Sequence, residues 1–342
     1  MASIITLVRL LLLLLPVPLR KHLWPASHQA EDLAGAGELL HPIFMVPGVS
    51  CSDLEARLTE AYQPSIPSCG ALKAKGWFGL YENSSDISEH HYHKCFEEQM
   101  SLVYDPIRNE YRNLASVETR VPYFGIVKGY HQKNPLGPKW CLTRLIEALE
   151  EMGYRDGDTM LGAPYDFRYA APIPGQTSQF YSHYFKELME LVEATSEKHH
   201  KKVIIFGHSL GGMVILEFIR STPLAWRDKY IKHLILVAPT LSTGFLSSVI
   251  YLASGPQGDL LYVPKATALS LRPMWRSFET SIINIPSTKA YGHKPIVITK
   301  QRNYSAYDME DLLTDIGFEH AIEPFRRRVM PKMNYFKAPM VP

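Results

Sequence analysis

The sequence contains no Walker-type or dinucleotide-binding glycine pattern, no internal repeat and no extended low-complexity stretch. These absences argue against the common nucleotide-binding loops, solenoid folds and long disordered linkers. There is also little excess of charge of one sign, because 36 Lys and Arg residues face 34 Asp and Glu residues and the formal net charge is only +2 at pH 7. This balance argues against nucleic acid or a strongly anionic molecule as a partner. The remaining composition, 46% hydrophobic and 20% charged over 342 residues, indicates one large α/β domain with insertions or two small domains.

The first residues differ from the rest of the chain. Arg9 precedes the apolar run Leu10–Leu15, which is too short to span a bilayer comfortably and is followed by prolines. We predict a secretory signal peptide within residues 1–36, with a signal anchor as the alternative. The protein is then expected in the secretory pathway: secreted, vacuolar or lysosomal, or in an endomembrane lumen. Asn83 and Asn303 begin Asn-x-Ser triplets and become glycosylation candidates on that route.

Cysteine is rare, with only four residues in the chain. In an oxidising compartment a local Cys69–Cys95 bridge is expected, whereas an intracellular protein would keep reduced thiols. The segment between them carries aromatic residues, Trp77 among them, and is either an interfacial lid or a loop folded onto the core. The histidines of residues 90–93 lack a second ligand pair at a typical spacing, so no metal site is predicted.

One stretch carries a recognisable chemical pattern. The apolar run Val203–Phe206 breaks into Gly207–Gly211, a G-x-S-x-G sequence, and then continues with helical periodicity. Strand, tight turn and helix form the setting in which Ser209 acts as a nucleophile, because the turn lifts its hydroxyl above the sheet. The alternative is an ordinary glycine-rich turn between a strand and a helix.

The surrounding pattern is typical of a doubly wound α/β fold. Strands are expected within residues 41–48, 158–162, 203–206 and 234–237, and helices over 140–154 and 180–199. Residues 241–325 are irregular and proline-rich, which favours a cap over the pocket. The run Arg326–Arg328 is expected to be a solvated helix end.

Several motifs together resemble the lecithin:cholesterol acyltransferase family, which includes lysosomal phospholipases A with transacylase activity; the last hundred residues look most like its plant branch. The matching stretches are Val46–Leu58, the Cys69–Cys95 segment with Trp77, Gly162–Arg168, Gly207–Gly212, Trp226–Ile231 and Asp315–Glu319. The resemblance implies an α/β-hydrolase fold over residues 41–342, with a mostly parallel sheet, a lid at about 69–95 and a cap at about 241–325.

The same resemblance assigns roles to single residues. Ser209 would be the acyl-accepting nucleophile, and the backbone amides of Val49 and Leu210 would form the oxyanion hole. Asp166 and Arg168 are expected either to hold the loop beside the pocket or to contact substrate. Cys51-Ser52-Asp53 stands where the family often has glycine and asparagine, which alters the loop shape. Ala238–Ser242 replaces the family's APWGG, which affects the acyl pocket.

A serine nucleophile needs a histidine base and a carboxylate, which in this fold follow it along the chain. His208 adjoins the serine, but its side chain is expected to point elsewhere. His233 falls at the wrong end of a strand, and His293 and His320 fall in the cap. We do not expect Asp308, Asp315 and His320 to form a substitute triad. The triad Asp and His are therefore expected to be absent, with the last strands missing from a C-terminally incomplete or inactive chain.

By resemblance, the predicted function is transfer of a fatty acyl group from a glycerophospholipid, through acyl-Ser209, to a sterol, another lipid alcohol or water. The alternatives are a phospholipase A that only hydrolyses and a non-catalytic lipid-binding protein. The expected partner is a phospholipid membrane or a lipoprotein-like surface. The reading implies no nucleic acid, metal or organic cofactor.

Overall fold

The computed structural model describes residues 40–80, 90–130, 141–240, 244, 246–255 and 268–335. The predicted signal region, residues 1–36, and the glycosylation candidate Asn83 lie outside these ranges. Within them, no helix combines the length and the apolar character needed to cross a membrane.

Four parallel strands form the central sheet, in the order β7-β1-β8-β9. They are β7 (Met160–Gly162), β1 (Ile43–Val46), β8 (Val203–His208) and β9 (Ile231–Val237). Every residue of β1 is buried, as expected for an apolar strand covered on both faces. Phe44 lies opposite Leu161 on one side and Ile205 on the other. The predicted mostly parallel α/β sheet is confirmed.

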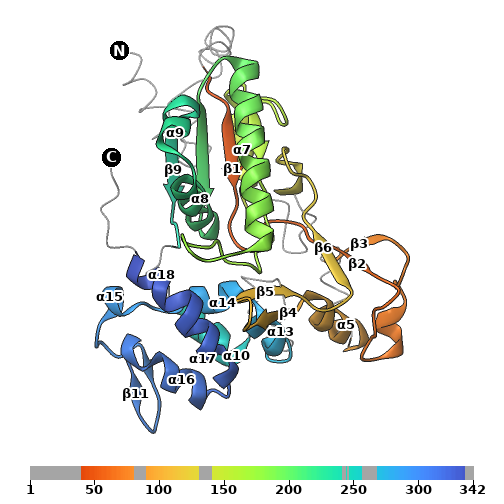
Figure 1. Ribbon diagram of the computed structural model, residues 1–342, viewed down its shortest axis with the longest axis vertical. Coiled ribbons are helices and arrows are strands. Elements are labelled where there is room, and N and C mark those ends of the chain that lie inside the picture. The colour runs from red at the N-terminus through yellow and green to blue at the C-terminus, as the bar shows by residue number, and fades with distance from the viewer. Residues whose placement is uncertain are drawn as a thin grey trace, which may run out of the picture.

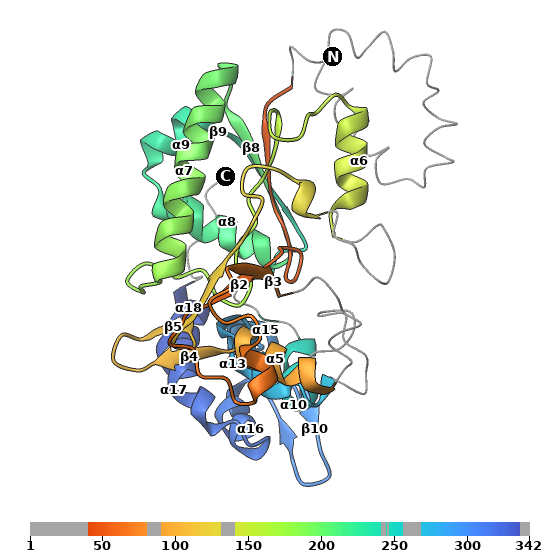
Figure 2. The ribbon, with the colours of Figure 1, turned by 90° about the vertical axis from the view of Figure 1, so that its right-hand side faces the viewer.

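Helices cover both faces of this sheet, with α6 on one face and α7, α8 and α9 on the other (Figures 1 and 2). They are α6 (Thr143–Glu151), α7 (Gln179–His199), α8 (Leu210–Ser221) and α9 (Leu224–Tyr230). Ser178 begins α7 by accepting a hydrogen bond from the Tyr181 amide, and His200 ends it with a left-handed φ of 51°. Ile146 of α6 and Leu188 of α7 belong to separate apolar clusters, because the sheet lies between them.

An antiparallel region extends from the lower end of the sheet (Figure 1). Its first sheet has the order β3-β2-β6, and β4 and β5 form a second pair. The elements are β2 (Glu55–Leu58), η1 (Pro67–Gly70), β3 (Trp77–Gly79), α5 (His90–Met100), β4 (Leu102–Asp105), β5 (Glu110–Asn113) and β6 (Val117–Arg120). The turn η2 (Lys128–Tyr130) follows β6 along the chain and packs between the central sheet and α6. The predicted lid, residues 69–95, overlaps η1, β3 and α5, and its action as a lid stays a prediction.

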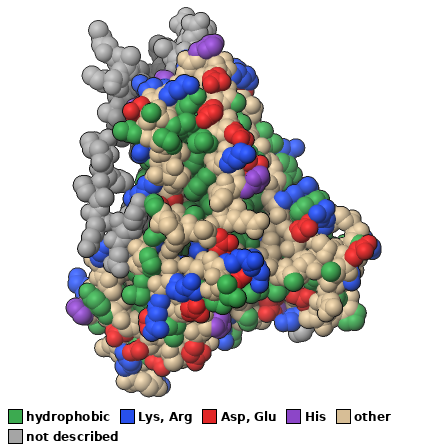
Figure 3. Space-filling model, viewed as in Figure 1, with side chains coloured by type: hydrophobic (Ala, Val, Ile, Leu, Met, Phe, Trp, Pro, Cys, Tyr) green, Lys and Arg blue, Asp and Glu red, His purple; other side chains and the backbone are tan. Residues whose placement is uncertain are grey.

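Short helices form a separate layer below the sheet (Figures 1 and 2). They are α10 (Ser247–Ser254), α13 (Arg272–Ser277), α14 (Glu279–Ile283), α15 (Thr288–Tyr291), η3 (Ala306–Asp308), α16 (Met309–Asp315), η4 (Glu319–Ala321), α17 (Ile322–Pro324), the π-turn η5 (Phe325–Val329) and α18 (Met330–Tyr335), with strands β10 (Val297–Ile298) and β11 (Asn303–Tyr304) between α15 and η3. This layer overlaps the predicted cap, residues 241–325, and continues to Tyr335. On the face seen in Figure 3, acidic and basic side chains are interspersed over it.

The expectation of a solvated helix end at Arg326–Arg328 is wrong for Arg328. Its side chain is only 1% exposed, forms an ion pair with Glu279 and donates to the carbonyl oxygens of Asn109 and Thr177. Arg326 and Arg327 do remain exposed. Consecutive residues of a helix point in different directions, so one arginine of the run falls on the inner face.

Lys332, one turn further along, is also buried. Its ammonium group donates to the Ala171 carbonyl oxygen over 2.6 Å and lies in the electrostatic field of Glu217 on α8. Burial lowers the pKa of Lys332 to about 8, and burial raises the pKa of the Glu217 carboxyl. The C-terminal helices are therefore attached to the sheet layer through buried charges.

The lowered pKa of Lys332 predicts that the contribution of this residue to stability rises with pH. Between about pH 8 and its ordinary value of 10.5 the unfolded chain binds more protons than the folded one, so raising the pH favours the fold. The full effect is up to about 3 kcal/mol. Buried tyrosines with a raised pKa, such as Tyr154 and Tyr184, act in the opposite direction at high pH, so the effect of Lys332 is measured as a difference between proteins. We expect the urea-unfolding free energy of wild type minus that of Lys332→Met to be larger at pH 9.5 than at pH 7.5. Lys186→Met, at an exposed position on α7, should keep the pH dependence of wild type; an unchanged pH dependence in Lys332→Met would contradict the prediction.

Candidate active site

Ser209 lies at the junction of β8 and α8, at the carboxyl end of the parallel sheet. Its backbone has φ 54° and ψ −123°, a conformation that costs a non-glycine residue about 1–3 kcal/mol. Three backbone hydrogen bonds of 3.0 Å hold it there. The Ser209 amide donates to the Val237 carbonyl oxygen, and the amides of Gly212 and Thr240 donate to the Ser209 carbonyl oxygen. This is the strained strand-to-helix turn that the sequence predicted around Ser209.

The glycines of the motif are required by close backbone contacts. A Cβ at Gly207 would lie 2.9 Å from the Cα of Gly212, and a Cβ at Gly211 would lie 2.3 Å from the Pro47 carbonyl oxygen. Side chains at these positions would push α8 away from the strands. The glycine pattern thus follows from the packing of the turn.

The turn after β1 packs directly against the serine. A Cβ at Gly48 would lie 3.1 Å from Nδ1 of His208 and 3.2 Å from Cβ of Ser209. The next residue is Val49, so its amide belongs to a turn that touches the nucleophile. Leu210 is the first residue of α8, where amides have no carbonyl partner in their own helix. Both candidate oxyanion-hole amides therefore lie on segments beside Ser209.

Tyr165 holds this turn from one side. Its hydroxyl donates to the Pro47 carbonyl oxygen over 3.1 Å, and its amide donates to Oγ of Ser52 over 3.2 Å. Tyr165 is fully buried. The Gly162–Arg168 motif thus positions the strand end that approaches Ser209.

Two disulfides are present. Cys69–Cys95 joins η1 to α5, as the sequence indicated. Cys51–Cys141 joins the turn after β1 to the segment before α6 and was missed, because a sequence separation of 90 residues gives no local signal for pairing.

Asp166 and Arg168 form a buried ion pair with side-chain exposures of 2% and 0%. The Arg168 guanidinium also donates to the Met100 carbonyl oxygen, to Asn113 and to Thr119 at 2.9–3.0 Å. These partners come from α5, β5 and β6. Among the two roles that the sequence left open, the geometry corresponds to holding the loop beside the site.

Trp77 does not lie on an exposed lid loop. It is part of strand β3, half-buried, with the guanidinium groups of Arg57 and Arg120 at 5.1 Å and 4.4 Å from its ring centroid. The next residue, Phe78, packs against the main core. The alternative of a segment folded onto the core therefore applies to these aromatics, since strand pairing with β2 orients them.

The histidines lie in different settings. His208 is half-buried beside Gly48, and burial lowers its pKa. His233 is exposed on β9, and the ring of His293 stacks on Tyr307 at a centroid distance of 4.2 Å. Burial also lowers the pKa of His320, with a smaller contribution from Arg276. Within the described ranges, none of these histidines is hydrogen-bonded to the Ser209 hydroxyl.

The carboxylates considered for a substitute triad serve local structure. Asp308 accepts hydrogen bonds from the amide and the hydroxyl of Ser305 and closes a capping box at η3. Asp315 accepts a hydrogen bond of 2.5 Å from the Tyr304 hydroxyl. The expectation that Asp308, Asp315 and His320 do not replace the triad stays a prediction.

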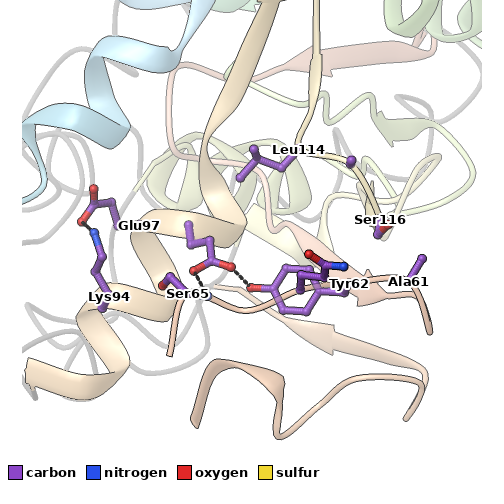
Figure 4. Close-up of a pocket in the computed structure, with 10 residues that line it drawn as sticks. Ala61, Tyr62, Ser65, Lys94, Glu97, Leu114 and Ser116 are labelled. Atoms are coloured by element: carbon purple, nitrogen blue, oxygen red, sulfur yellow. Dashed lines mark hydrogen bonds and ion pairs between the residues drawn. The ribbon is translucent and has the colours of Figure 1, made fainter. Parts of the chain in front are cut away.

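A cavity of about 660 Å³ lies in the antiparallel region rather than at Ser209 (Figure 4). Its polar groups largely satisfy one another: Glu98 accepts from the Tyr62 hydroxyl and the Ser65 amide, and Lys94 pairs with Glu97. Among the described residues no group of three or more His, Cys, Asp or Glu side chains could hold a metal ion.

A serine on a strained turn at the end of a parallel sheet, with a second backbone turn against it, is typical of α/β proteins that use a serine nucleophile. Residues 78–327 match the family described as lecithin:cholesterol acyltransferase. The chain belongs to this family.

Named relatives extend the match. The chain is 38% identical over 310 residues to lecithin-cholesterol acyltransferase-like 1 of Oryza sativa subsp. japonica, covering 90% of this chain and 68% of the relative. It is 28% identical over 293 residues to lysosomal phospholipase A and acyltransferase of Rattus norvegicus, covering 84% and 67%. It is 28% identical over 280 residues to human phosphatidylcholine-sterol acyltransferase, covering 81% and 60%. The resemblance inferred from the motifs is confirmed.

Proposed function

We propose that this protein is a lipid acyl-transfer enzyme in which Ser209 accepts a fatty acyl group from a glycerophospholipid. The observation that carries the proposal is the strained backbone of Ser209, held between β8 and α8 with the Gly48–Val49 turn against it. Attack by its hydroxyl oxygen on the ester carbonyl forms the acyl–Ser209 C–O bond and breaks the C–O bond between the acyl carbon and the glycerol oxygen. The serine proton ends on that glycerol oxygen, and the lysophospholipid leaves as the alcohol. A lipid alcohol such as a sterol, or water, then takes the acyl group from Ser209.

The two neighbouring amides would stabilise the charge that develops on the carbonyl oxygen. The Val49 amide approaches from the turn after β1, and the Leu210 amide from the N-terminus of α8, where the helix dipole also favours negative charge. Removal of one such donor typically lowers the rate about 10²–10³-fold. Val49 and Leu210 act here through their backbone, so their side chains need not contact the reacting atoms.

A second candidate function is lipid binding without catalysis. It is supported by the histidine next to Ser209, since Nδ1 of His208 is buried without a hydrogen-bond partner among the described residues and so does not bind the Ser209 hydroxyl. Without a base to take its proton, a serine hydroxyl is a weak nucleophile. The surroundings of Ser209 would then hold a phospholipid without cleaving it.

A fluorophosphonate probe separates these two functions, because it modifies only activated serines. We expect labelling of the wild-type protein at Ser209, identified by peptide mass spectrometry, and no labelling of Ser209→Ala. Vesicles of phosphatidylcholine with a fluorescent acyl chain, with and without a sterol, then show whether the acyl group is transferred or released. Vesicle binding without labelling would contradict the enzymatic proposal and favour the second.

The surroundings proposed for this chemistry are a lipid surface in the secretory pathway. The two disulfides support an oxidising compartment. Asn303 is exposed at the start of β11, where a glycan could be attached. The helical layer below the sheet is proposed to be the cap over the pocket.

A further inference from the structure

The turn that approaches Ser209 is also covalently attached, at Cys51. Cys51 lies two residues after Val49 and is bonded to Cys141, at a Cα–Cα distance of 5.8 Å. Cys141 comes directly before α6, which covers the opposite face of the sheet from α8 (Figure 2). The disulfide therefore connects the turn to a helix that does not otherwise belong to the site.

The backbone at both ends of this bond is in a strained conformation. Ser50, beside Cys51, has φ 55°, and Cys141 itself has φ 55°. Such left-handed conformations of non-glycine residues persist when the surrounding structure fixes them. One backbone hydrogen bond within the turn, from the Cys51 amide to the Gly48 carbonyl oxygen, is long at 3.4 Å and therefore weak.

We propose that the Cys51–Cys141 disulfide is a positioning device for the Val49 amide. Tyr165 holds the turn at Pro47 and Ser52, and the disulfide holds it at Cys51 from the α6 side. Val49 lies between these two attachments, only partly buried. Loss of the bond frees the middle of the turn, moves the amide from its place beside Ser209 and lowers the reactivity of the serine. This role in reactivity rests on the proposed function of Ser209.

The test compares Cys51→Ala/Cys141→Ala with the wild type by two readouts. Hydrogen–deuterium exchange reports on the turn whether or not the protein is an enzyme, and we expect the amides of residues 48–54 to exchange at least tenfold faster in the variant. Fluorophosphonate labelling reports on the site, and we expect the rate at Ser209 to fall about 10–100-fold, as for a weakened oxyanion donor.

A stability-matched control separates positioning from general destabilisation. Leu188→Ala removes a buried side chain of α7, away from the turn, and should lower stability by about 2–5 kcal/mol. Loss of a disulfide closing a loop of this length costs roughly 4–5 kcal/mol by the chain-entropy estimate. At a temperature where both variants are folded, Leu188→Ala should leave turn exchange and labelling rate within about twofold of wild type.

Three results would overturn the positioning role: unchanged turn exchange in the double variant, equal acceleration in Leu188→Ala, or a looser turn with an unchanged labelling rate. If the wild type itself is not labelled, the proposed function fails, and turn exchange alone decides whether the disulfide holds the turn.

If the double variant does not fold, limited reduction of the folded wild type replaces it. Cys141 is partly exposed, and peptide mass spectrometry identifies the bond that was opened.

Discussion

Replacing Arg168 by methionine is expected to lower the free energy of unfolding by about 3–5 kcal/mol, because it leaves the Asp166 carboxylate buried without its countercharge. The loss extends further than the ion pair. Acceptors on Met100, Asn113 and Thr119 would lose a donor together, and a buried polar group left unpaired costs about 1–3 kcal/mol. Urea unfolding of the purified variant measures the effect.

A surface pair provides the matched control. Like Arg168, Arg155 donates to an aspartate through two nitrogens, in this case to Asp158, but the Arg155 side chain is 70% exposed. Arg155→Met should therefore cost less than about 1 kcal/mol. The double variant Asp166→Asn/Arg168→Met should recover about 1–3 kcal/mol relative to Arg168→Met alone, since the uncompensated charge is gone. Equal losses at Arg155 and Arg168 would show that burial is not the cause.

Local patterns were sufficient to predict the elements around Ser209. The strand Val203–Phe206 and the helix from Phe180 to His199 each carry their own periodicity, and the observed β8 and α7 differ from them by only a few residues at the ends. The glycine spacing around Ser209 records the shape of the turn directly. Such features depend on neighbours in sequence, so sequence alone is informative about them.

Features that depend on distant contacts were not predictable in this way. Cys51 pairs with Cys141 because the fold brings the turn after β1 close to the start of α6. No local sequence pattern predicts this contact between distant segments. The burial of Arg328 depends on a partner distant in sequence, the Glu279 carboxylate of α14. An arginine run in sequence looks the same whether its members face water or a buried Glu279.

The same distinction applies to Trp77. An aromatic-rich segment between two cysteines suggests a lid by composition, yet pairing with β2 turns Trp77 toward two arginines. Those arginines are in turn paired with Glu118 and Glu55 on the antiparallel sheet. The composition of the segment indicated exposed aromatic side chains. The pairing of β3 with β2 instead places Arg57 and Arg120 over the Trp77 ring.

Replacing Gly211 by alanine is expected to destabilise the protein, although helix propensity alone predicts the reverse. Within a helix, alanine is favoured over glycine by about 1 kcal/mol. At Gly211 the new Cβ would lie 2.3 Å from the Pro47 carbonyl oxygen and 2.5 Å from that of Val46. Both atoms are backbone, so relief requires β1 and its turn to move away from α8. We expect a loss at or above the upper end of the 1–3 kcal/mol typical of overpacking.

The movement should also separate the Val49 amide from Ser209, so fluorophosphonate labelling should fall at least 100-fold, as for loss of an oxyanion donor. Gly175→Ala is the matched control: its φ is +89° and no atom lies within 4 Å of the added Cβ, so only about 1 kcal/mol of backbone strain is expected and labelling should be retained. Stabilisation by Gly211→Ala would mean that α8 does not contact β1 and its turn as closely as described. Destabilisation with normal labelling would mean that this contact holds the fold without positioning the oxyanion turn, and the assignment of the Val49 amide would then have to be abandoned.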